Sequence, residues 1–288
     1  MATPQHPVAC MSVDVEDWFQ TENFKCVLDP ARWDEFALRV ESATDWILER
    51  MAETGAKGTF FTLGWVAERC PSLVRRIVEQ GHELASHGHA HELVTKQTPE
   101  VFREDIRRAK GILEDCGGVR VIGYRAPSFS ITDWAVKVLH EEGYMYDSSH
   151  FPTLAHDRYG HLSGAGAENV IFQPIEGFWE VGMSTVSLGR KGIPWAGGAY
   201  FRLIPGGMFR NGIRKILKER SPYVFYIHPW EIDVDQPRLP GVPLTKRLRH
   251  YTNLRLAPGR FAELCREFKW TTIREVLEPQ LGANAWSL

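Results

Sequence analysis

The 288-residue sequence contains no long apolar run, no dense basic segment and no closely paired cysteines. No stretch approaches the roughly 18 consecutive apolar residues that a transmembrane helix needs. The formal net charge is -2, whereas tight nucleic-acid binding requires a basic footprint. The five cysteines are scattered and form no C-x-x-C motif, which excludes a disulfide framework or a zinc knuckle.

The beginning of the chain also lacks the pattern of a secretory signal. Residues 1–12 contain no basic segment followed by an apolar one. These features predict a soluble, cytoplasmic protein with reduced cysteines. Hydrophobic residues make up 43% and charged residues 24%, as in ordinary globular proteins. The 10 Trp, 15 Phe and 8 Tyr are consistent with a carbohydrate ligand, because aromatic rings stack on sugar faces.

Segments with strand and helix periodicity alternate about seven times, which predicts a parallel α/β architecture. Strands are expected over residues 8–15, 59–63, 83–86, 119–124, 144–147, 170–175, 179–181 and 223–227. Helices are expected over residues 33–51, with Gly55 as cap, and over 71–81, 99–113, 133–142, 208–218, 261–268 and 272–277. Residues 157–166 and 237–243 are expected to be loops.

Polar residues fall just after several different strands, which favours a closed or nearly closed barrel over an open sheet. The C-terminal rim of the strands carries the active site in such barrels. The residues at expected strand ends are Asp14, Glu16, His87, Arg125, Asp147 and His228. The fold class is therefore predicted to be α/β, with a distorted (β/α) barrel of about seven strands.

Three carboxylates follow the first expected strand, in Asp14-Val15-Glu16-Asp17. Asp14 and Glu16 point to the same side of an extended segment. Buried together without a cation, they would repel each other. A metal ligand beside a general base explains the cluster, as does a solvated acidic turn.

Three of the 11 histidines lie in the segment His87-Gly88-His89-Ala90-His91. Neutral imidazole is the commonest metal ligand, although a solvated loop also tolerates such a cluster. His87 and His91, four residues apart, are expected to face a metal, whereas His89 points elsewhere. With one carboxylate they form the ligand set of zinc hydrolases and of non-haem Fe(II) oxygenases. A second carboxylate that acts as a base favours hydrolysis.

An acid and a cation complete the predicted constellation. His228 follows a buried aromatic run and is placed to protonate a departing amine. Its candidate orienting groups are Asp147, Glu231 and Asp233. Arg125 is expected to hold the base carboxylate ionised and oriented.

The turn after Arg125 supplies candidate hydrogen-bond donors for an oxyanion. Pro127 stiffens this turn. The backbone N–H groups of Ser128 or Phe129 are candidates for an oxyanion site.

As a set, these motifs resemble polysaccharide deacetylases of the NodB type (carbohydrate esterase family 4). The motifs are Asp14-Val15-Glu16, Ser86-His87-Gly88-His89-Ala90-His91, Arg125-Ala126-Pro127 and Tyr226-Ile227-His228. Three segments also resemble the branch found beside exosortase and exopolysaccharide genes. They are Asp14-Val15-Glu16-Asp17-Trp18-Phe19, Gly197-Gly198-Ala199-Tyr200-Phe201-Arg202 and His228-Pro229-Trp230-Glu231-Ile232-Asp233. The similarity spans nearly the whole chain.

The resemblance implies a distorted barrel and a divalent metal, most often Zn²⁺. It also implies removal of acetyl groups from N-acetylated amino sugars of a polysaccharide or a lipid-linked precursor. One deacetylase domain is expected over residues 1–288, in which residues 150–288 are a family-specific extension that completes the barrel. The expected partner is such a glycan, with no nucleic acid.

Roles carried over from the family follow its motifs residue by residue. The catalytic residues implied are Asp14 as base, His228 as acid and Arg125 as tether of the base. The metal ligands implied are Glu16, His87 and His91.

The sequence departs from the family pattern in two places. The usual adjacent Asp-Asp is replaced here, so the carboxylate ligand is Glu16 or Asp17; Glu16 is favoured because it shares a face with Asp14. The fourth motif, with its pocket Trp and orienting Asp, has no clean match. Asp147-Ser148-Ser149 and Trp179 are its candidates.

Two other functions fit the same barrel. One is metal-independent hydrolysis of a cyclic amide such as allantoin, which the presence of both His87 and His91 disfavours. The other is a catalytically silent module that binds carbohydrate. The presence of every expected catalytic residue type disfavours this second function.

Overall fold

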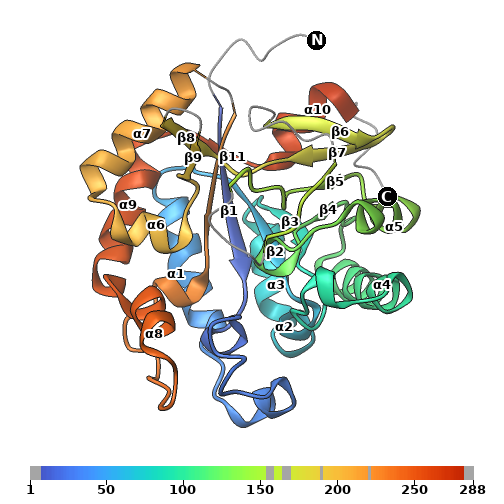
Figure 1. Cartoon of the computed structure of the whole chain (residues 1–288), viewed down its shortest axis with the longest axis horizontal. Coiled ribbons are helices and arrows are strands. Elements are labelled where there is room, and N and C mark those ends of the chain that lie inside the picture. Colours follow the sequence, from blue (N-terminus) through green and yellow to red (C-terminus); the bar gives the residue numbers. More distant parts are fainter. Residues whose placement is uncertain (1–7, 154–158, 164–169, 189–190, 220–221, 282–288) are drawn as a thin grey trace.

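The computed structural model describes residues 8–153, 159–163, 170–188, 191–219 and 222–281. A single curled sheet passes through the middle of the molecule, and helices cover its outside (Figure 1). The strand order is β10-β1-β2-β3-β4-β5-β7-β6, and β11 pairs with β1. The two ends of this sheet, β10 and β6, are not paired with each other in the described part of the chain, so the barrel is open.

Seven strands of this sheet run parallel from β10 to β7, as predicted. They are β1 (Ala9–Val15), β2 (Gly58–Thr62), β3 (Glu83–Ser86), β4 (Gly123–Tyr124), β5 (Tyr146–Asp147), β7 (Phe178–Val181) and β10 (Tyr223–Ile227). Antiparallel β6 (Ile171–Ile175) flanks β7, and short β11 (Trp270–Thr271) lies beside β1. A separate hairpin is formed by β8 (Thr185–Leu188) and β9 (Lys191–Pro194). The α/β barrel expected from the sequence is thus confirmed as a curled, open sheet.

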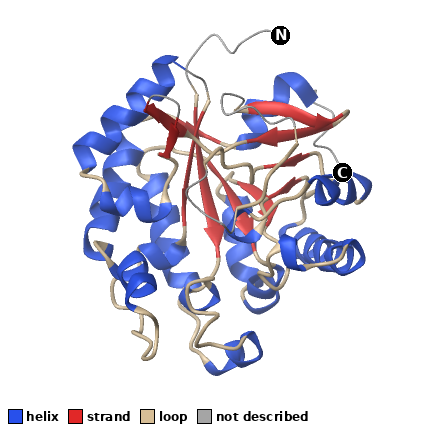
Figure 2. Ribbon diagram, in the orientation of Figure 1, coloured by secondary structure: helices blue, strands red, loops and turns tan. Residues whose placement is uncertain are grey.

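Ten α-helices surround the sheet in the described residues (Figure 2). They are α1 (Val40–Ala52), α2 (Gly64–Arg69), α3 (Pro71–Glu79), α4 (Pro99–Gly117), α5 (Asp133–Glu141), α6 (Gly198–Leu203), α7 (Gly206–Glu219), α8 (Leu244–Tyr251), α9 (Ala257–Glu267) and α10 (Ile273–Leu281). Local sequence sets their ends: the Thr98 hydroxyl caps α4, and Gly118 ends it with a φ of 64°. Among the described helices, none is both long and apolar enough to cross a membrane.

The strand register brings the functional segments to one edge of the sheet. Every residue of β1 is buried, as expected for a strand covered on both faces. In register, β1 pairs Asp14 with Phe61 of β2 and Val13 with Ile227 of β10. The residues that follow these parallel strands therefore meet at the same C-terminal edge.

Two of the expected strands are much shorter than predicted. Residues 119–124 and 144–147 contribute only two residues each, to β4 and β5. The reason lies in tertiary contacts, because the Val121 N–H donates to the Glu114 carboxylate of α4 at 2.9 Å instead of to a neighbouring strand. Tyr144 N–H likewise donates to the Leu139 carbonyl at the end of α5.

The helix expected over residues 33–51 is divided in two. A 3₁₀ helix covers Pro30–Glu35, and α1 begins at Val40. The Asp17 carboxylate, distant in sequence, accepts hydrogen bonds from the N–H groups of Arg39 and Val40 and so fixes the start of α1. Sequence periodicity did not predict the strands β8, β9 and β11. Of the loop expected over residues 157–166, only 159–163 lie within the described residues.

Candidate active site

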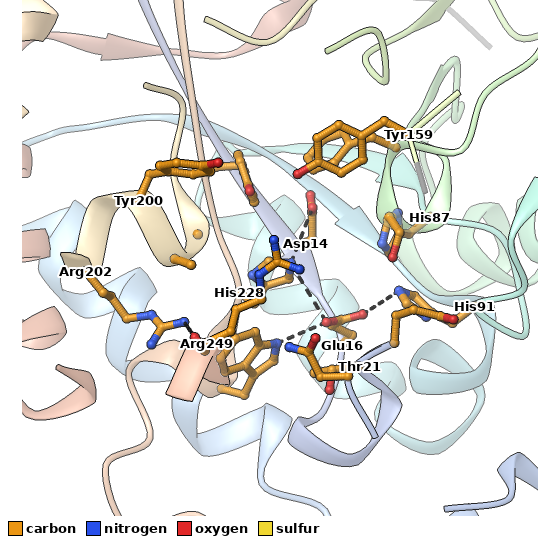
Figure 3. Close-up of a pocket in the computed structure, with 18 residues that line it drawn as sticks. Asp14, Glu16, Thr21, His87, His91, Tyr159, Tyr200, Arg202, His228 and Arg249 are labelled. Carbon is orange, nitrogen blue, oxygen red and sulfur yellow. Dashed lines mark hydrogen bonds and ion pairs between the residues drawn. The ribbon is translucent and has the colours of Figure 1, made fainter. Parts of the chain in front are cut away.

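A pocket opens at the C-terminal edge of the parallel strands (Figure 3). Its floor carries the acidic and imidazole side chains Asp14, Glu16, His87, His91 and His228. Its walls include the aromatic side chains Phe129, Tyr159, Tyr200, Tyr226 and Trp230. The strand-end residues that the sequence singled out are thus brought together in one cavity, except Arg125, which lies beneath it, and Asp147.

Glu16, His87 and His91 form a buried group with the donor atoms of a metal site. One ligand atom from each lies within 4.8 Å of the others. The His91 Nε2 atom is 2.6 Å from the Glu16 Oε2 atom, and Glu16 is 2% exposed. Burial raises the pKa of Glu16, but the neighbouring His91 charge and hydrogen bond outweigh burial and hold that pKa well below its usual range.

The tautomer of His87 is fixed by the backbone. Its Nδ1 atom lies 2.8 Å from the Arg125 carbonyl oxygen, so Nδ1 carries the proton and Nε2 keeps its lone pair. Burial lowers the pKa of His87 to about 4, which makes the ring neutral at neutral pH. A neutral imidazole with a free lone pair is the form that binds a metal.

The loop between His87 and His91 is held by the carboxylate of Asp105 in α4. Asp105 accepts hydrogen bonds from the N–H groups of His89 and Ala90 at 2.8 and 3.2 Å. At Gly88, with a φ of 74°, a Cβ would lie 2.7 Å from the Asp105 carboxylate, so only glycine allows this close approach. His91 itself has a φ of 52°, a strained conformation typical of functional positions.

His89 points away from the pocket, although it lies between the two candidate ligands. Its Nε2 atom is 3.3 Å from the Glu68 carboxylate on α2. The backbone turn at Gly88 therefore places alternate histidines on opposite sides of the loop. This direction agrees with the expectation that His89 is not a ligand.

The adjacent acids Glu16 and Asp17 have different surroundings. Asp17 accepts hydrogen bonds from three backbone N–H groups, those of Trp18, Arg39 and Val40, at 2.7 to 2.9 Å. Both of its oxygens are thereby committed to the protein. Of the two alternatives that the sequence left open, only Glu16 faces the two histidines, which supports it as the carboxylate ligand.

Arg125 fixes Asp14 from beneath the pocket. Its Nη1 atom lies 2.7 Å from Asp14 Oδ1 and donates to Ser12 Oγ at 2.7 Å. Its Nε and Nη2 atoms donate to the carbonyl and hydroxyl of Ser148, and the guanidinium lies on the ring of Phe61. Arg125 is fully buried, so its ion pair with Asp14 is screened little by water. Sequence reasoning did not predict that Ser12 and Ser148 bind Arg125; Ser148 was named only within the fourth-motif candidate Asp147-Ser148-Ser149.

His228 extends into the pocket from the end of β10. Its Nε2 atom lies 3.9 Å from Asp14 Oδ2 and 3.8 Å from Glu16 Oε1, and its Nδ1 atom lies 2.8 Å from Glu231 Oε1. Burial lowers the pKa of His228, but the hydrogen bond to Glu231 and the charges of Glu16, Glu231 and Asp14 together raise it to about 9. His228 is therefore an imidazolium at neutral pH.

Glu231 is the acid that orients His228, among the three candidates from the sequence. Its other oxygen, Oε2, accepts a hydrogen bond from Arg202 Nε at 2.7 Å. Burial raises the pKa of Glu231, yet the charge of Arg202 and the bond to His228 lower it to about 2. The other candidates are occupied elsewhere: Asp147 accepts from the Ser149 hydroxyl, and Asp233 pairs with Arg39.

The fourth-motif candidates do not reach the pocket. Asp147 is paired in register with Glu180 across β5 and β7, and burial raises the pKa of both carboxyls. Trp179 is not among the pocket residues, whereas Trp230 is. The pocket tryptophan thus comes from the segment after β10, two residues beyond His228, within the motif His228-Pro229-Trp230-Glu231-Ile232-Asp233.

Ser128 and Phe129 both have positive φ values, of 52° and 58°. The Phe129 N–H donates to the Ala126 carbonyl at 2.9 Å, so it is not available to an oxyanion. Ser128 lines the pocket and stays the candidate donor of this turn. The Phe129 ring packs against the rings of Tyr226 and Tyr159 and forms an apolar wall.

Comparison with known families agrees with this arrangement. Residues 33–146 match the polysaccharide deacetylase family, and residues 148–278 match a domain of unknown function, DUF3473. The chain therefore carries a polysaccharide deacetylase domain of the NodB type, the carbohydrate esterase family 4 group, followed by a DUF3473 segment. The predicted family resemblance is confirmed at this level.

Curated relatives match over about a third of the chain. A peptidoglycan deacetylase-like protein of Gibberella zeae is 32% identical over 103 residues, which are 36% of this chain and 30% of that protein. A peptidoglycan-N-acetylglucosamine deacetylase of Bacillus cereus is 30% identical over 102 residues, which are 35% and 37% of the two chains. The match thus spans only about a third of the length of each of these two relatives.

Solved structures share the fold over almost the whole chain. A Mycobacterium smegmatis protein classed as a polysaccharide deacetylase superposes with a TM-score of 0.63 at 21% identity, covering 97% of this chain and 92% of that one. A family 4 pseudoenzyme from Bacillus anthracis superposes with a TM-score of 0.51 at 13% identity, covering 96% and 66%. Since an inactive protein shares the fold, activity has to be argued from the site.

Proposed function

We propose that this protein is a metal-dependent N-deacetylase that removes acetyl groups from N-acetylated amino sugars of a polysaccharide or a lipid-linked glycan precursor. One observation carries the proposal. A carboxylate held by an arginine, Asp14, and an imidazolium held by a carboxylate, His228, both border the buried Glu16–His87–His91 group. Amide hydrolysis needs a base, an acid and an electrophile, and these groups supply the first two beside a site for the third.

The residues present fit a divalent metal ion. Two buried imidazoles and one buried carboxylate converge. The Glu16 Oε2 atom is buried without a hydrogen-bond donor, and the His91 ring, at 2.6 Å, is its ion-pair neighbour. Two nitrogen ligands and one oxygen ligand with open positions form the donor set of catalytic zinc sites, so Zn²⁺ is the ion we propose. When bound there, it polarises the amide carbonyl and lowers the pKa of a coordinated water.

The Asp14 and His228 side chains divide the proton transfers between them. Asp14 Oδ1 is taken by Arg125, which leaves Oδ2 toward the pocket to accept the proton of the attacking water. His228, charged at neutral pH, delivers the proton from Nε2 to the amine that leaves. Arg125 keeps Asp14 in one orientation, and Glu231 keeps His228 Nδ1 occupied, so each group presents one functional atom to the substrate.

The walls of the pocket support a sugar substrate. Phe129, Tyr159, Tyr200, Tyr226 and Trp230 offer ring faces and edges around the polar floor. The Bacillus cereus relative is named for activity on peptidoglycan N-acetylglucosamine, and the motif resemblance favours an exopolysaccharide. The class that both share, a polymer or precursor with N-acetylated amino sugars, is the substrate that we propose.

Acetate release combined with metal analysis tests the proposal. The purified protein should carry close to one equivalent of divalent metal and release acetate from N-acetylglucosamine oligomers. Removal of the metal with a chelator should abolish release, and Zn²⁺ should restore it. A metal-loaded protein that deacetylates no amino-sugar substrate would contradict the proposal, and an active, metal-free protein would favour a cyclic-amide hydrolase.

A further inference from the structure

The indole of Trp230 makes a direct contact with the candidate metal ligand Glu16. Its Nε1 atom donates to Glu16 Oε1 at 3.0 Å, and Trp230 is only 6% exposed. The other oxygen, Oε2, lies 2.6 Å from His91 Nε2 (Figure 3). Glu16 Oε1 thus accepts the indole hydrogen bond, with His228 Nε2 at 3.8 Å, and Oε2 lies beside His91.

Two imidazole rings stack against the indole of Trp230. The His228 ring stacks on it with centroids 5.0 Å apart, and the His250 ring stacks on it at 4.2 Å and 14°. The His250 Nε2 atom lies 2.6 Å from Gln236 Oε1, and Gln236 Nε2 donates to the Trp230 carbonyl at 2.6 Å. These contacts hold the indole with its N–H directed at Glu16.

We propose that Trp230 is a positioning residue that assigns Glu16 Oε1 to the protein and Oε2 to the metal, and so sets metal affinity and ligand geometry. This inference rests on the metal site proposed above. Outer hydrogen bonds to metal-binding carboxylates orient the ligand, and their loss typically weakens metal binding about 10- to 100-fold. Without the indole N–H, Glu16 is free to rotate and offer both oxygens.

The inference also shows that one short segment supports both the acid and a candidate metal ligand. Trp230 lies two residues after His228 in one 3₁₀ turn, whose start is fixed by the His228–Glu231 pair. The same short segment therefore holds the acid through Glu231 and the candidate ligand through Trp230. A displacement of this segment would change both.

The test replaces Trp230 by Phe and uses Trp270→Phe as a matched control. Trp270 is equally buried at 6% and also loses a single indole hydrogen bond, to the Leu264 carbonyl at 2.8 Å, away from the pocket. Zinc affinity is measured by competition with a chromophoric chelator. We expect Trp230→Phe to weaken affinity about 10- to 100-fold, with Trp270→Phe close to wild type.

The visible spectrum of the Co²⁺-substituted protein gives a second readout that general destabilisation does not change. Trp230→Phe should shift and weaken the ligand-field bands as Glu16 changes its coordination, and Trp270→Phe should not. Should the Phe variant fail to fold, Trp230→Met makes the same comparison, because methionine fills irregular space without a donor.

Unchanged affinity and spectrum in the Trp230 variant, with metal bound normally by the wild type, would overturn this inference and leave the proposed function intact. A wild-type protein that binds no metal would overturn the proposed metal site as well.

Discussion

The first half of the chain, residues 8–147, brings the metal-binding and basic groups to the pocket, whereas the second half, residues 148–281, brings the acid and most of the walls. Asp14 lies near the end of β1, and Glu16, His87 and His91 come from the segments that follow β1 and β3. His228 and Trp230 follow β10, which pairs directly with β1. The two halves therefore meet along the β10–β1 pair, as they also do along β5 and β7, and the pocket lies where β1 and β10 end.

The two halves also hold their functional groups in different ways. In the first half, one residue fixes two of the groups: the Arg125 carbonyl orients His87, and the buried Arg125 guanidinium orients Asp14. In the second half, the buried ion pair between Glu231 and Arg202 fixes the acid, and Arg202 is itself bonded to carbonyls around the end of α8. Orientation of the functional groups thus depends on one arginine, through its carbonyl and its guanidinium, in the first half, and on the Glu231–Arg202 pair in the second.

The difference has a consequence for family comparison. The deacetylase match covers residues 33–146, so it includes His87, His91 and Arg125 but not Asp14, Glu16 or His228. The proposed base and acid come from outside that match, and the acid lies in the DUF3473 segment. The DUF3473 segment of this chain therefore supplies part of the proposed active site.

The largest expected effect separates two histidines of the first half. His87→Ala should weaken metal binding by more than about a hundredfold, because loss of an outer hydrogen bond alone costs up to that much. His89→Ala should retain the metal, since His89 faces Glu68. Metal content by mass spectrometry and acetate release distinguish the variants, and metal loss in both would place His89 among the ligands.

The second-largest expected effect comes from replacing the proposed general acid, His228, in the second half of the chain. His228→Gln should lower kcat by about 10²- to 10⁴-fold, the typical contribution of a general acid, and leave metal content unchanged. The readouts are steady-state kinetics and metal analysis. A variant that kept its kcat would show that the acid comes from elsewhere.

A smaller effect concerns the charged network of the second half. Glu231 raises the pKa of His228 toward its value of about 9, and the acid works only when protonated, so wild-type activity should fall as pH rises through the pKa of His228. Glu231→Gln removes the supporting charge and lowers that pKa. The alkaline limb of the kcat profile should therefore move to lower pH, and kcat on that limb should fall about tenfold for each pH unit that the limb moves. Asp233→Asn, which alters the acid paired with Arg39, serves as the control and should leave the profile in place.

The smallest effect separates Asp17 from its neighbour Glu16. Asp17→Ala removes the acceptor for three backbone N–H groups and should lower the free energy of unfolding by about 2 kcal/mol, with metal content unchanged. Glu16→Ala, by contrast, should lose the bound metal. Denaturant unfolding and metal analysis measure both, and a metal-free Asp17 variant would reopen the choice of ligand.

Sequence patterns predicted the alternation of strands and helices well, because periodicity reports which face of an element is buried. They failed where distant contacts decide local structure. The break between residues 35 and 40 depends on Asp17, and the short β4 depends on Glu114. At Gly123, too, a contact distant in sequence restricts the residue type, since a Cβ there would lie 2.2 Å from the Tyr146 ring.

The chain's own sequence determined which chemical groups are available: paired acids, spaced histidines, an arginine and a strand-end histidine, all in motifs that indicate a family 4 deacetylase. Only the tertiary structure decided between Glu16 and Asp17, chose Glu231 to orient His228 and identified Trp230 as the pocket tryptophan. The reason is physical. Residue type and spacing fix what a side chain is able to bind, but its partner depends on which segments the sheet brings within hydrogen-bond distance.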